Sequence, residues 1–186
     1  MEYKEITLEQ GSSAWLTWRN EGIGASDAST IMGENRFKSR EELLHEKKHQ
    51  INEPPNAAMM EGTRLEPQAR MAYEKSVGFN VEPLCIESLK YPWLKASLDG
   101  ISQKRDLLVE IKCGKSAMRE AQREIIPKYY YGQIQHQLMV TGLEKIDYWC
   151  YRPENGGVLL EALRDNSYIR KLLKIELEFY NAMKDS

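Results

Sequence analysis

Residues 97–113 read SLDGISQKRDLLVEIKC, and this stretch predicts a β-hairpin. Apolar residues dominate 94–98 and 107–112, which is typical of two strands. Gly100 and the polar residues 102–105 lie between them and indicate the turn. We therefore expect the two strands to pair and to bring their charged residues close together.

Charged side chains in this hairpin point to metal-assisted chemistry. Because residues two apart in a strand face the same side, Glu110 and Lys112 project together while Ile111 turns into the core. The hairpin can bring Asp99 beside Glu110, where two carboxylates would disfavour each other's ionisation. A divalent cation would resolve the repulsion, and oxygen ligands, with the Ile111 carbonyl among them, favour Mg²⁺ or Mn²⁺. Glu66, on a preceding helix, is a further candidate acid.

An E-x-K triplet by itself is weak evidence, because it usually marks a solvated, salt-bridged strand edge. In this chain residues 107–109 and Cys113 flank the triplet and indicate a strand that is buried on at least one face. Charged side chains are seldom buried unless they are paired or bind a metal. The apolar setting and the preceding Asp-Gly pair therefore favour a functional site.

Length and composition predict one globular domain over residues 1–186, since 41% of the residues are hydrophobic and 29% are charged. The 26 basic and 28 acidic residues give a net charge of −2, which argues against a nucleic-acid-binding coat but allows a local basic groove. The three cysteines include no CxxC pair, which excludes a zinc ribbon or a cysteine-ligated cluster. The chain has no long apolar run and no signal-like leader, so we expect a cytoplasmic protein without membrane contact.

The remaining sequence predicts a mixed α/β fold in which helices flank a central sheet. Helical spacing and capping residues predict helices at 14–18, 26–32, 39–47, 57–77, 128–140 and from 166 onward. Apolar or alternating runs predict strands at 80–86, 94–98, 107–112, 146–151 and 158–162. The predicted order is helices, three strands, a helix, two strands and a final helix.

Six motifs in order, from residue 9 to about residue 141, make the chain resemble a known family. They are EQGSSAW at 9–15, Arg19 with GIGAS at 22–26, EGTRLE at 61–66, SLDG at 97–100, EIKC at 110–113, and Tyr130, Gln133, Gln135 with 140–141. This pattern is similar to the phage lambda exonuclease, or YqaJ-like viral recombinase, family of PD-(D/E)xK nucleases. One departure is Leu98, which stands where the signature has proline. The resemblance implies a restriction-endonuclease-like core with a central mixed sheet flanked by helices.

The resemblance implies a Mg²⁺-dependent 5′→3′ exonuclease, with Mn²⁺ as a substitute. Such an enzyme digests one strand of linear double-stranded DNA from a 5′-phosphate end, releases mononucleotides and leaves a 3′ overhang for phage-type annealing recombination. The resemblance also implies a ring of three identical subunits, a single-strand annealing protein as partner, and a phage or prophage origin in a bacterial cytoplasm. A closed ring around the duplex would reconcile the net charge of −2 with a DNA substrate.

The resemblance divides the site residues into two groups. The catalytic and metal-binding group is Asp99, Glu110, the Ile111 carbonyl, Lys112, Glu66 and Gln133. The group that would contact the 5′-phosphate and DNA is Arg19, Ser26, Trp15, Tyr130 and Gln135. Lys112 would position the attacking water, Glu66 would contact metal-bound water or a second metal, and Gln133 would orient groups near the scissile phosphate.

The residues themselves support parts of this assignment. Ser26 heads a predicted helix, where free N–H groups favour an anion, and Arg19 offers a bidentate fork for a terminal phosphate. The alternative is that Ser26 only caps the helix and Arg19 is a surface charge. Gln133 and Gln137 are four residues apart and therefore share one helix face.

Two other functions fit the same core. An endonuclease would need no anchor for a terminal phosphate, so the Arg19 and Ser26 pair favours an end-directed enzyme over it. A DNA-binding or assembly subunit with a decayed site should lack at least one of Asp99, Glu110 and Lys112, and all three are present. A Cas4-like nuclease is disfavoured because the cysteines for its iron–sulfur cluster are missing.

Overall fold

A mixed β-sheet organises the computed structural model, which describes residues 2–185. The strand order is β1-β3-β4-β5-β6-β7, with the short β2 paired to β4. Neighbouring strands are antiparallel except for the parallel pairs β5–β6 and β2–β4. The strands are β1 (Tyr3–Ile6), β2 (Ile23–Gly24), β3 (Val81–Ser88), β4 (Leu94–Ser102), β5 (Leu108–Lys112), β6 (Lys145–Arg152) and β7 (Gly156–Leu163).

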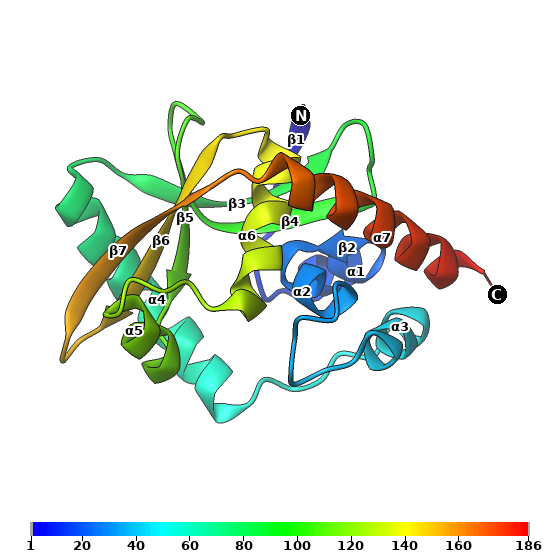
Figure 1. The fold of residues 1–186 in the computed structure, drawn as a ribbon, viewed down its shortest axis with the longest axis horizontal. Coiled ribbons are helices and arrows are strands. Elements are labelled where there is room, and N and C mark those ends of the chain that lie inside the picture. Colours follow the sequence, from blue (N-terminus) through cyan, green and yellow to red (C-terminus); the bar gives the residue numbers. More distant parts are fainter. Residues whose placement is uncertain (1, 186) are drawn as a thin grey trace.

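Helices cover both faces of this sheet (Figure 1). The helix α4 packs on one face, where Leu65 and Tyr73 meet Ile111 and Trp149. The helix α6 crosses the other face and is joined there by α2, α5 and α7. The helices are α1 (Ser13–Asn20), α2 (Ala28–Ile31), α3 (Arg40–His49), α4 (Ala57–Val77), α5 (Lys115–Ala121), α6 (Lys128–Thr141) and α7 (Asn166–Lys184), with a 3₁₀ helix η1 (Ala25–Asp27) before α2.

Capping residues account for several helix boundaries. Ser12 accepts a backbone N–H from the first turn of α1, and Ser39 and Glu42 form a reciprocal capping box at the start of α3. Gly78 and Gly142 end α4 and α6 with φ angles of 82° and 77°, a left-handed conformation that favours glycine. These signals are local, which explains why the sequence predicts the same boundaries.

The structure differs from the predicted elements in three respects. It contains β1, β2 and α5, none of which the sequence pattern predicted. Gly100 lies inside β4 rather than in the turn, and the turn follows Ser102, whose carbonyl accepts a hydrogen bond from Arg105 N at 2.9 Å. The predicted helix at 26–32 forms as η1 followed by α2.

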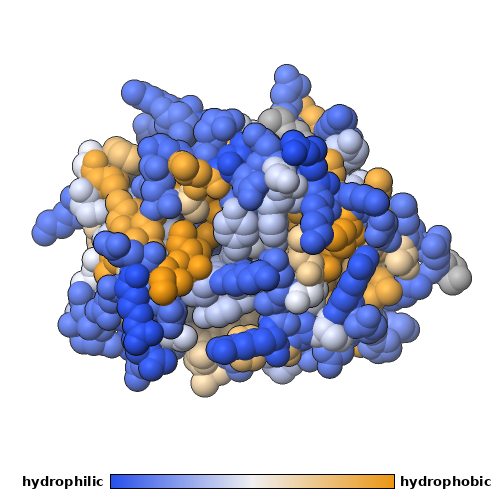
Figure 2. Space-filling model, viewed as in Figure 1, coloured by the Kyte–Doolittle hydropathy of each residue, from blue (hydrophilic) through white to orange (hydrophobic). Residues whose placement is uncertain are grey.

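Hydrophilic residues cover most of the face shown in Figure 2. Hydrophobic residues gather on it in two places, over β7 toward α5 and along α7. None of the helices within residues 2–185 combines the length and the apolar character that crossing a membrane would require.

Candidate active site

The strands β4 and β5 separate where the acidic residues lie. Their pairing joins Ile101 to Leu108 and Gly100 to Val109. Beyond that point, Asp99 Oδ2 accepts a hydrogen bond from the backbone N–H of Ile111 at 2.8 Å. A side-chain carboxylate therefore replaces the missing backbone partner and is fixed against β5.

Glu110 is the centre of the site. It lies on the β5 face that meets α6 and is only 1% exposed. Its Oε1 accepts hydrogen bonds from Gln133 Nε2 at 2.7 Å and from Lys112 Nζ at 2.5 Å. Its Oε2 accepts one from Gln137 Nε2 at 2.5 Å. The glutamines reach the same carboxylate because residues four apart share a helix face.

Lys112 keeps its positive charge in this setting. Burial by itself lowers the pKa of Lys112, but the carboxylates of Glu110 and Asp99 outweigh it and raise that pKa above its ordinary value. The Nζ atom also lies 4.6 Å from the ring centre of Tyr130, where the π-electrons favour a cation. In this charged form Lys112 can donate hydrogen bonds and stabilise negative charge.

The neighbouring carboxyl groups hold protons more tightly than isolated ones do. Desolvation, followed by the charges of Glu110 and Glu66, raises the pKa of Asp99 well above its usual range, against the opposing effect of Lys112. Desolvation also raises the pKa of Glu66, with Glu110 adding to the effect and Arg70 opposing it. A divalent cation among these oxygens would relieve the repulsion.

Arg70 was not predicted from the sequence, although its spacing from Glu66 gave a signal. Its Nη2 donates to Glu66 Oε1 at 2.5 Å, an i,i+4 pair on α4. Its Nε donates to the Asp99 carbonyl at 2.8 Å. Arg70 therefore connects α4 to the strand that carries Asp99, and it holds Glu66 beside the site.

The acids occupy one region but do not form a closed metal cage. Within residues 2–185, no group of three or more His, Cys, Asp or Glu side chains has an arrangement that could hold a metal ion. Asp99, Glu110 and Glu66 are instead engaged by the Ile111 N–H, by Lys112 and the two glutamines, and by Arg70. The available donors, carboxylate oxygens and a backbone carbonyl, nevertheless fit the ligand preference of Mg²⁺. Asp99 and Glu110 with the Ile111 carbonyl provide such a set.

Arg19 and Ser26 form a second polar cluster. Arg19 Nη2 donates to Ser26 Oγ at 2.8 Å and lies 3.6 Å from Asp27 Oδ1. Asp27 also pairs with Lys47 Nζ at 2.7 Å and accepts the Gly24 N–H at 3.0 Å. Burial raises the pKa of Asp27, but Lys47 and Arg19 lower it further than burial raises it, so the carboxylate stays ionised. Two basic side chains, Arg19 and Lys47, therefore face one carboxylate in this cluster.

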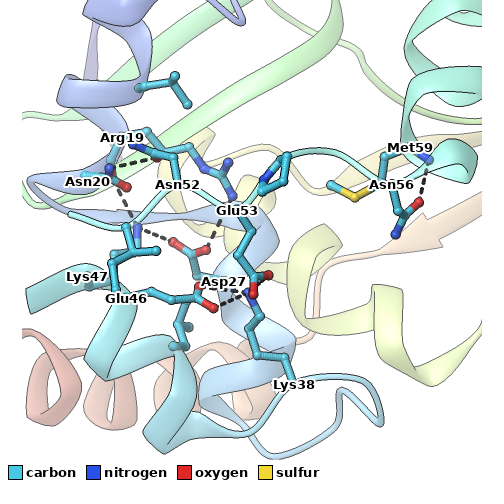
Figure 3. A pocket seen from close by; sticks show the side chains of 14 residues that line it. Arg19, Asn20, Asp27, Lys38, Glu46, Lys47, Asn52, Glu53, Asn56 and Met59 are labelled. Atoms are coloured by element: carbon cyan, nitrogen blue, oxygen red, sulfur yellow. Dashed lines mark hydrogen bonds and ion pairs between the residues drawn. The ribbon is translucent and has the colours of Figure 1, made fainter. Parts of the chain in front are cut away.

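A hollow of about 460 Å³ adjoins this cluster between α1, α3 and the segment that leads into α4 (Figure 3). Arg19 and Asp27 form part of its wall. Lys38 lies across it and pairs with Glu46 at 2.6 Å and with Glu53 at 3.0 Å. The hollow is therefore lined by both polar and apolar residues, and most of its charged side chains are paired.

Trp15 connects the two clusters. Its Nε1 donates to Ser97 Oγ at 2.8 Å, and Ser97 precedes Asp99 by two residues on β4. The Arg19 guanidinium lies 5.3 Å from the centre of the Trp15 ring. Trp15 therefore links Arg19 to β4, the strand that also carries Asp99.

The structure corrects one expectation about DNA contact, at Gln135, and one about a helix start, at Ser26. Gln135 is fully buried, where its Nε2 donates to the Leu163 carbonyl at 2.8 Å and its Oε1 accepts the Asp165 N–H at 2.8 Å. It therefore holds the junction between β7 and α7 and does not face DNA. Ser26 lies in a 3₁₀ turn before a four-residue helix, so it does not head a helix long enough to favour an anion by its dipole.

Comparisons with known proteins agree with this architecture. A family model described as the YqaJ-like viral recombinase domain matches residues 14–144. The uncharacterized protein YqaJ of Bacillus subtilis (strain 168) is 31% identical over 180 residues, which cover 93% of this chain and 56% of that protein. The chain thus spans little more than half the length of this relative.

Solved exonuclease structures share the fold. The alkaline exonuclease LHK-Exo from Laribacter hongkongensis has a TM-score of 0.81 at 25% identity over 93% of each chain. A complex of LHK-Exo with dAMP has a TM-score of 0.81 at 24% identity over 93% of each chain. A phage related exonuclease from Haemophilus somnus 129PT has a TM-score of 0.62 at 17% identity, over 88% of this chain and 92% of that one. The predicted mixed sheet flanked by helices is therefore confirmed.

Proposed function

Because this chain belongs to the YqaJ-like viral recombinase family, we propose that it is a Mg²⁺-dependent 5′→3′ exonuclease of linear double-stranded DNA. The observation that carries the proposal is the ion pair between buried Glu110 and half-buried Lys112 beside Asp99, at the point where β4 and β5 separate. Opposite charges in a largely buried setting, beside a second carboxyl whose pKa is raised, are typical of a hydrolytic site that works with a divalent cation. Mn²⁺ would substitute for Mg²⁺.

Each residue of the site has a distinct role in this proposal. Asp99, Glu110 and the Ile111 carbonyl would hold Mg²⁺, which supplies Lewis-acid stabilisation of the phosphoryl oxygens and a more acidic water. Lys112 donates to the attacking water and stabilises charge on the phosphate. Gln133 holds Lys112 and Glu110 in register, because its Oε1 lies 3.4 Å from Lys112 Nζ while its Nε2 donates to Glu110. Glu66 lies beside the site as a further acid.

The 5′ end would bind at the Arg19 and Ser26 cluster. A terminal phosphate is a dianion, and the Arg19 guanidinium offers it a planar pair of donors. Asp27 does not cancel that charge, because Lys47 already pairs with it at 2.7 Å. Trp15 lies beside Arg19 and offers a ring on which the terminal base could stack, and Tyr130 would line the path of the DNA next to Lys112.

We also propose that three copies form a ring around the duplex and deliver the 3′ overhang to a single-strand annealing protein. The net charge of −2 supports this proposal, because a ring that encircles the duplex would retain DNA without a strongly basic surface. Light scattering on the purified protein should give about three times the chain mass of 21.6 kDa. A monomer mass at micromolar concentration would contradict the ring.

The experiment for the activity compares three substrates with Mg²⁺ and with EDTA. They are linear duplex with a 5′-phosphate, the same duplex with a 5′-hydroxyl, and a covalently closed circle. We expect Mg²⁺-dependent release of mononucleotides from the phosphorylated linear DNA and no loss of the circle. Cleavage of the circle would indicate an endonuclease, and no cleavage with any divalent metal would indicate a binding or assembly role.

A further inference from the structure

The helix α6 carries two buried glutamines whose amide groups are used differently. Gln135 is 0% exposed and uses both its nitrogen and its oxygen in hydrogen bonds that join β7 to α7. Gln137 is 1% exposed and donates to Glu110 Oε2 at 2.5 Å, whereas its own Oε1 has no hydrogen-bond partner within the described part of the chain. An unpaired buried carbonyl costs about 1–3 kcal/mol. Stability alone therefore does not account for an amide at position 137.

The contact with Glu110 accounts for the amide. A carboxylate only accepts hydrogen bonds, so the NH₂ end of Gln137 must face it and the carbonyl must point away. Glu110 Oε1 already accepts from Lys112 and Gln133, so Gln137 supplies a donor on the opposite oxygen. Donors on both oxygens fix the rotation of the carboxylate plane.

The helix itself cannot turn to release this contact. His136, which precedes Gln137 on α6, forms hydrogen bonds with Glu176 Oε1 of α7 at 2.7 Å and with the Lys95 carbonyl of β4 at 3.0 Å. All three residues are buried. Gln137 is therefore held at a fixed angle toward Glu110.

We propose that Gln137 is a positioning residue that orients the Glu110 carboxylate and thereby sets the affinity of the site for a divalent cation. This inference rests on the proposed function. Residues that orient a metal-binding carboxylate are typically worth a factor of about 10–100 in metal affinity. The unpaired Oε1 of Gln137 is the structural cost of placing its amide there.

The test is Mn²⁺ binding to the DNA-free protein, measured by electron paramagnetic resonance of the unbound ion. Gln137→Met keeps the length of the side chain but removes the donor, and we expect its dissociation constant to rise about 10-fold or more. Gln135→Met is the matched control, because it removes an equally buried amide that does not touch Glu110. Its thermal stability should fall while its Mn²⁺ affinity stays at the wild-type value. Glu110→Gln gives the reference for a damaged site.

The outcomes separate this inference from the proposed function. Wild-type affinity in a folded Gln137→Met protein would overturn the inference but leave the proposed function intact. Absence of Mn²⁺ binding by the wild type, or an unchanged affinity in Glu110→Gln, would overturn the proposed function and the inference with it.

A second measurement needs no variant to fold. In wild-type protein labelled with ¹⁵N-glutamine, Mg²⁺ should shift the side-chain amide signal of Gln137, because its acceptor Glu110 then shares charge with the cation. The amide signal of Gln135 should stay in place. A Gln137 signal that Mg²⁺ does not move would contradict the inference.

Discussion

The Lys112 ammonium lies between the Glu110 carboxylate at 2.5 Å and the Tyr130 ring at 4.6 Å, and both contacts keep it charged. If it positions water and stabilises the phosphate, Lys112→Ala should lower the turnover number by about 10²–10⁴-fold. DNA binding, measured by fluorescence anisotropy without a metal, should remain close to that of the wild type. Turnover that stays within a few-fold of wild type would remove Lys112 from the mechanism.

Gly100, which follows Asp99 on β4, is closely packed against neighbouring side chains. A Cβ at this position would lie 2.6 Å from Val109 Cγ1 and 2.7 Å from Val81 Cγ2. Gly100→Ala should therefore reduce the free energy of unfolding by about 1–3 kcal/mol in a urea titration. Gly62→Ala is the control: its Cβ would meet nothing within 4 Å, and alanine should stabilise the α4 interior by about 1 kcal/mol. Equal effects at both positions would contradict the packing argument.

At the scale of elements, the buried His136–Glu176 pair joins α6 to α7, and Asp27 of η1 adds to the negative field around it. Burial lowers the pKa of His136, but Glu176 and the Lys95 carbonyl outweigh it and raise that pKa above 6.5. Burial raises the pKa of Glu176 above 4.5, and His136 only partly opposes this. In both cases the folded state binds the proton more tightly than the unfolded state.

The pair should therefore make stability depend on pH in one direction. The stabilisation from His136 is fully present below pH 6.5 and is lost as the pH rises through its raised pKa. Glu176→Gln removes the charge that holds the proton. The difference in free energy of unfolding between the wild type and Glu176→Gln should therefore decrease as the pH rises from about 6 to 9, by at most about 1.4 kcal/mol per pH unit. Urea titrations across this range measure the difference, and parallel curves would exclude a titrating pair.

Local patterns predicted most elements, and tertiary contacts explain those that were missed. Caps and glycine stops define α3, α4 and α6 within a few neighbouring residues, so the sequence carries their boundaries. The four-residue β1 exists because it pairs with β3, about eighty residues away, which no local pattern reveals. The seven-residue α5 has Gly114 at its N-cap without a side-chain hydrogen bond, so it gives no start signal.

The same distinction applies to the candidate site. Strand alternation predicted that Glu110 and Lys112 share a face, because that relation needs only the backbone period of two. The direction of Gln135 depends on how α6 lies against β7 and α7, and the sequence did not contain that information. Arg70 was missed for a similar reason: its bond to the Asp99 carbonyl is set by the docking of α4.

At the scale of the whole molecule, the end-binding candidates and the cleavage candidates are coupled through β4, where Trp15 bonds to Ser97 close to Asp99. If Arg19 holds the terminal phosphate, Arg19→Ala should remove most of the preference for 5′-phosphorylated over 5′-hydroxyl ends. Its rate on hydroxyl ends should change little. Initial rates on the two linear duplexes give the ratio, and an equal loss on both would argue against a phosphate pocket.

The contacts of α6 limit where related chains can gain or lose residues. Its consecutive turns engage β5 through Gln133 and Gln137, and α7 with β4 through His136. One residue inserted between Gln133 and His136 would rotate the later side chains by about 100° relative to Gln133. The contacts of His136 and Gln137 could then not form together with that of Gln133. Evolution should therefore place insertions and deletions in other segments. The spacing Q-x-x-H-Q at residues 133–137 is then a sequence criterion for whether a distant homologue has kept the contacts around Glu110.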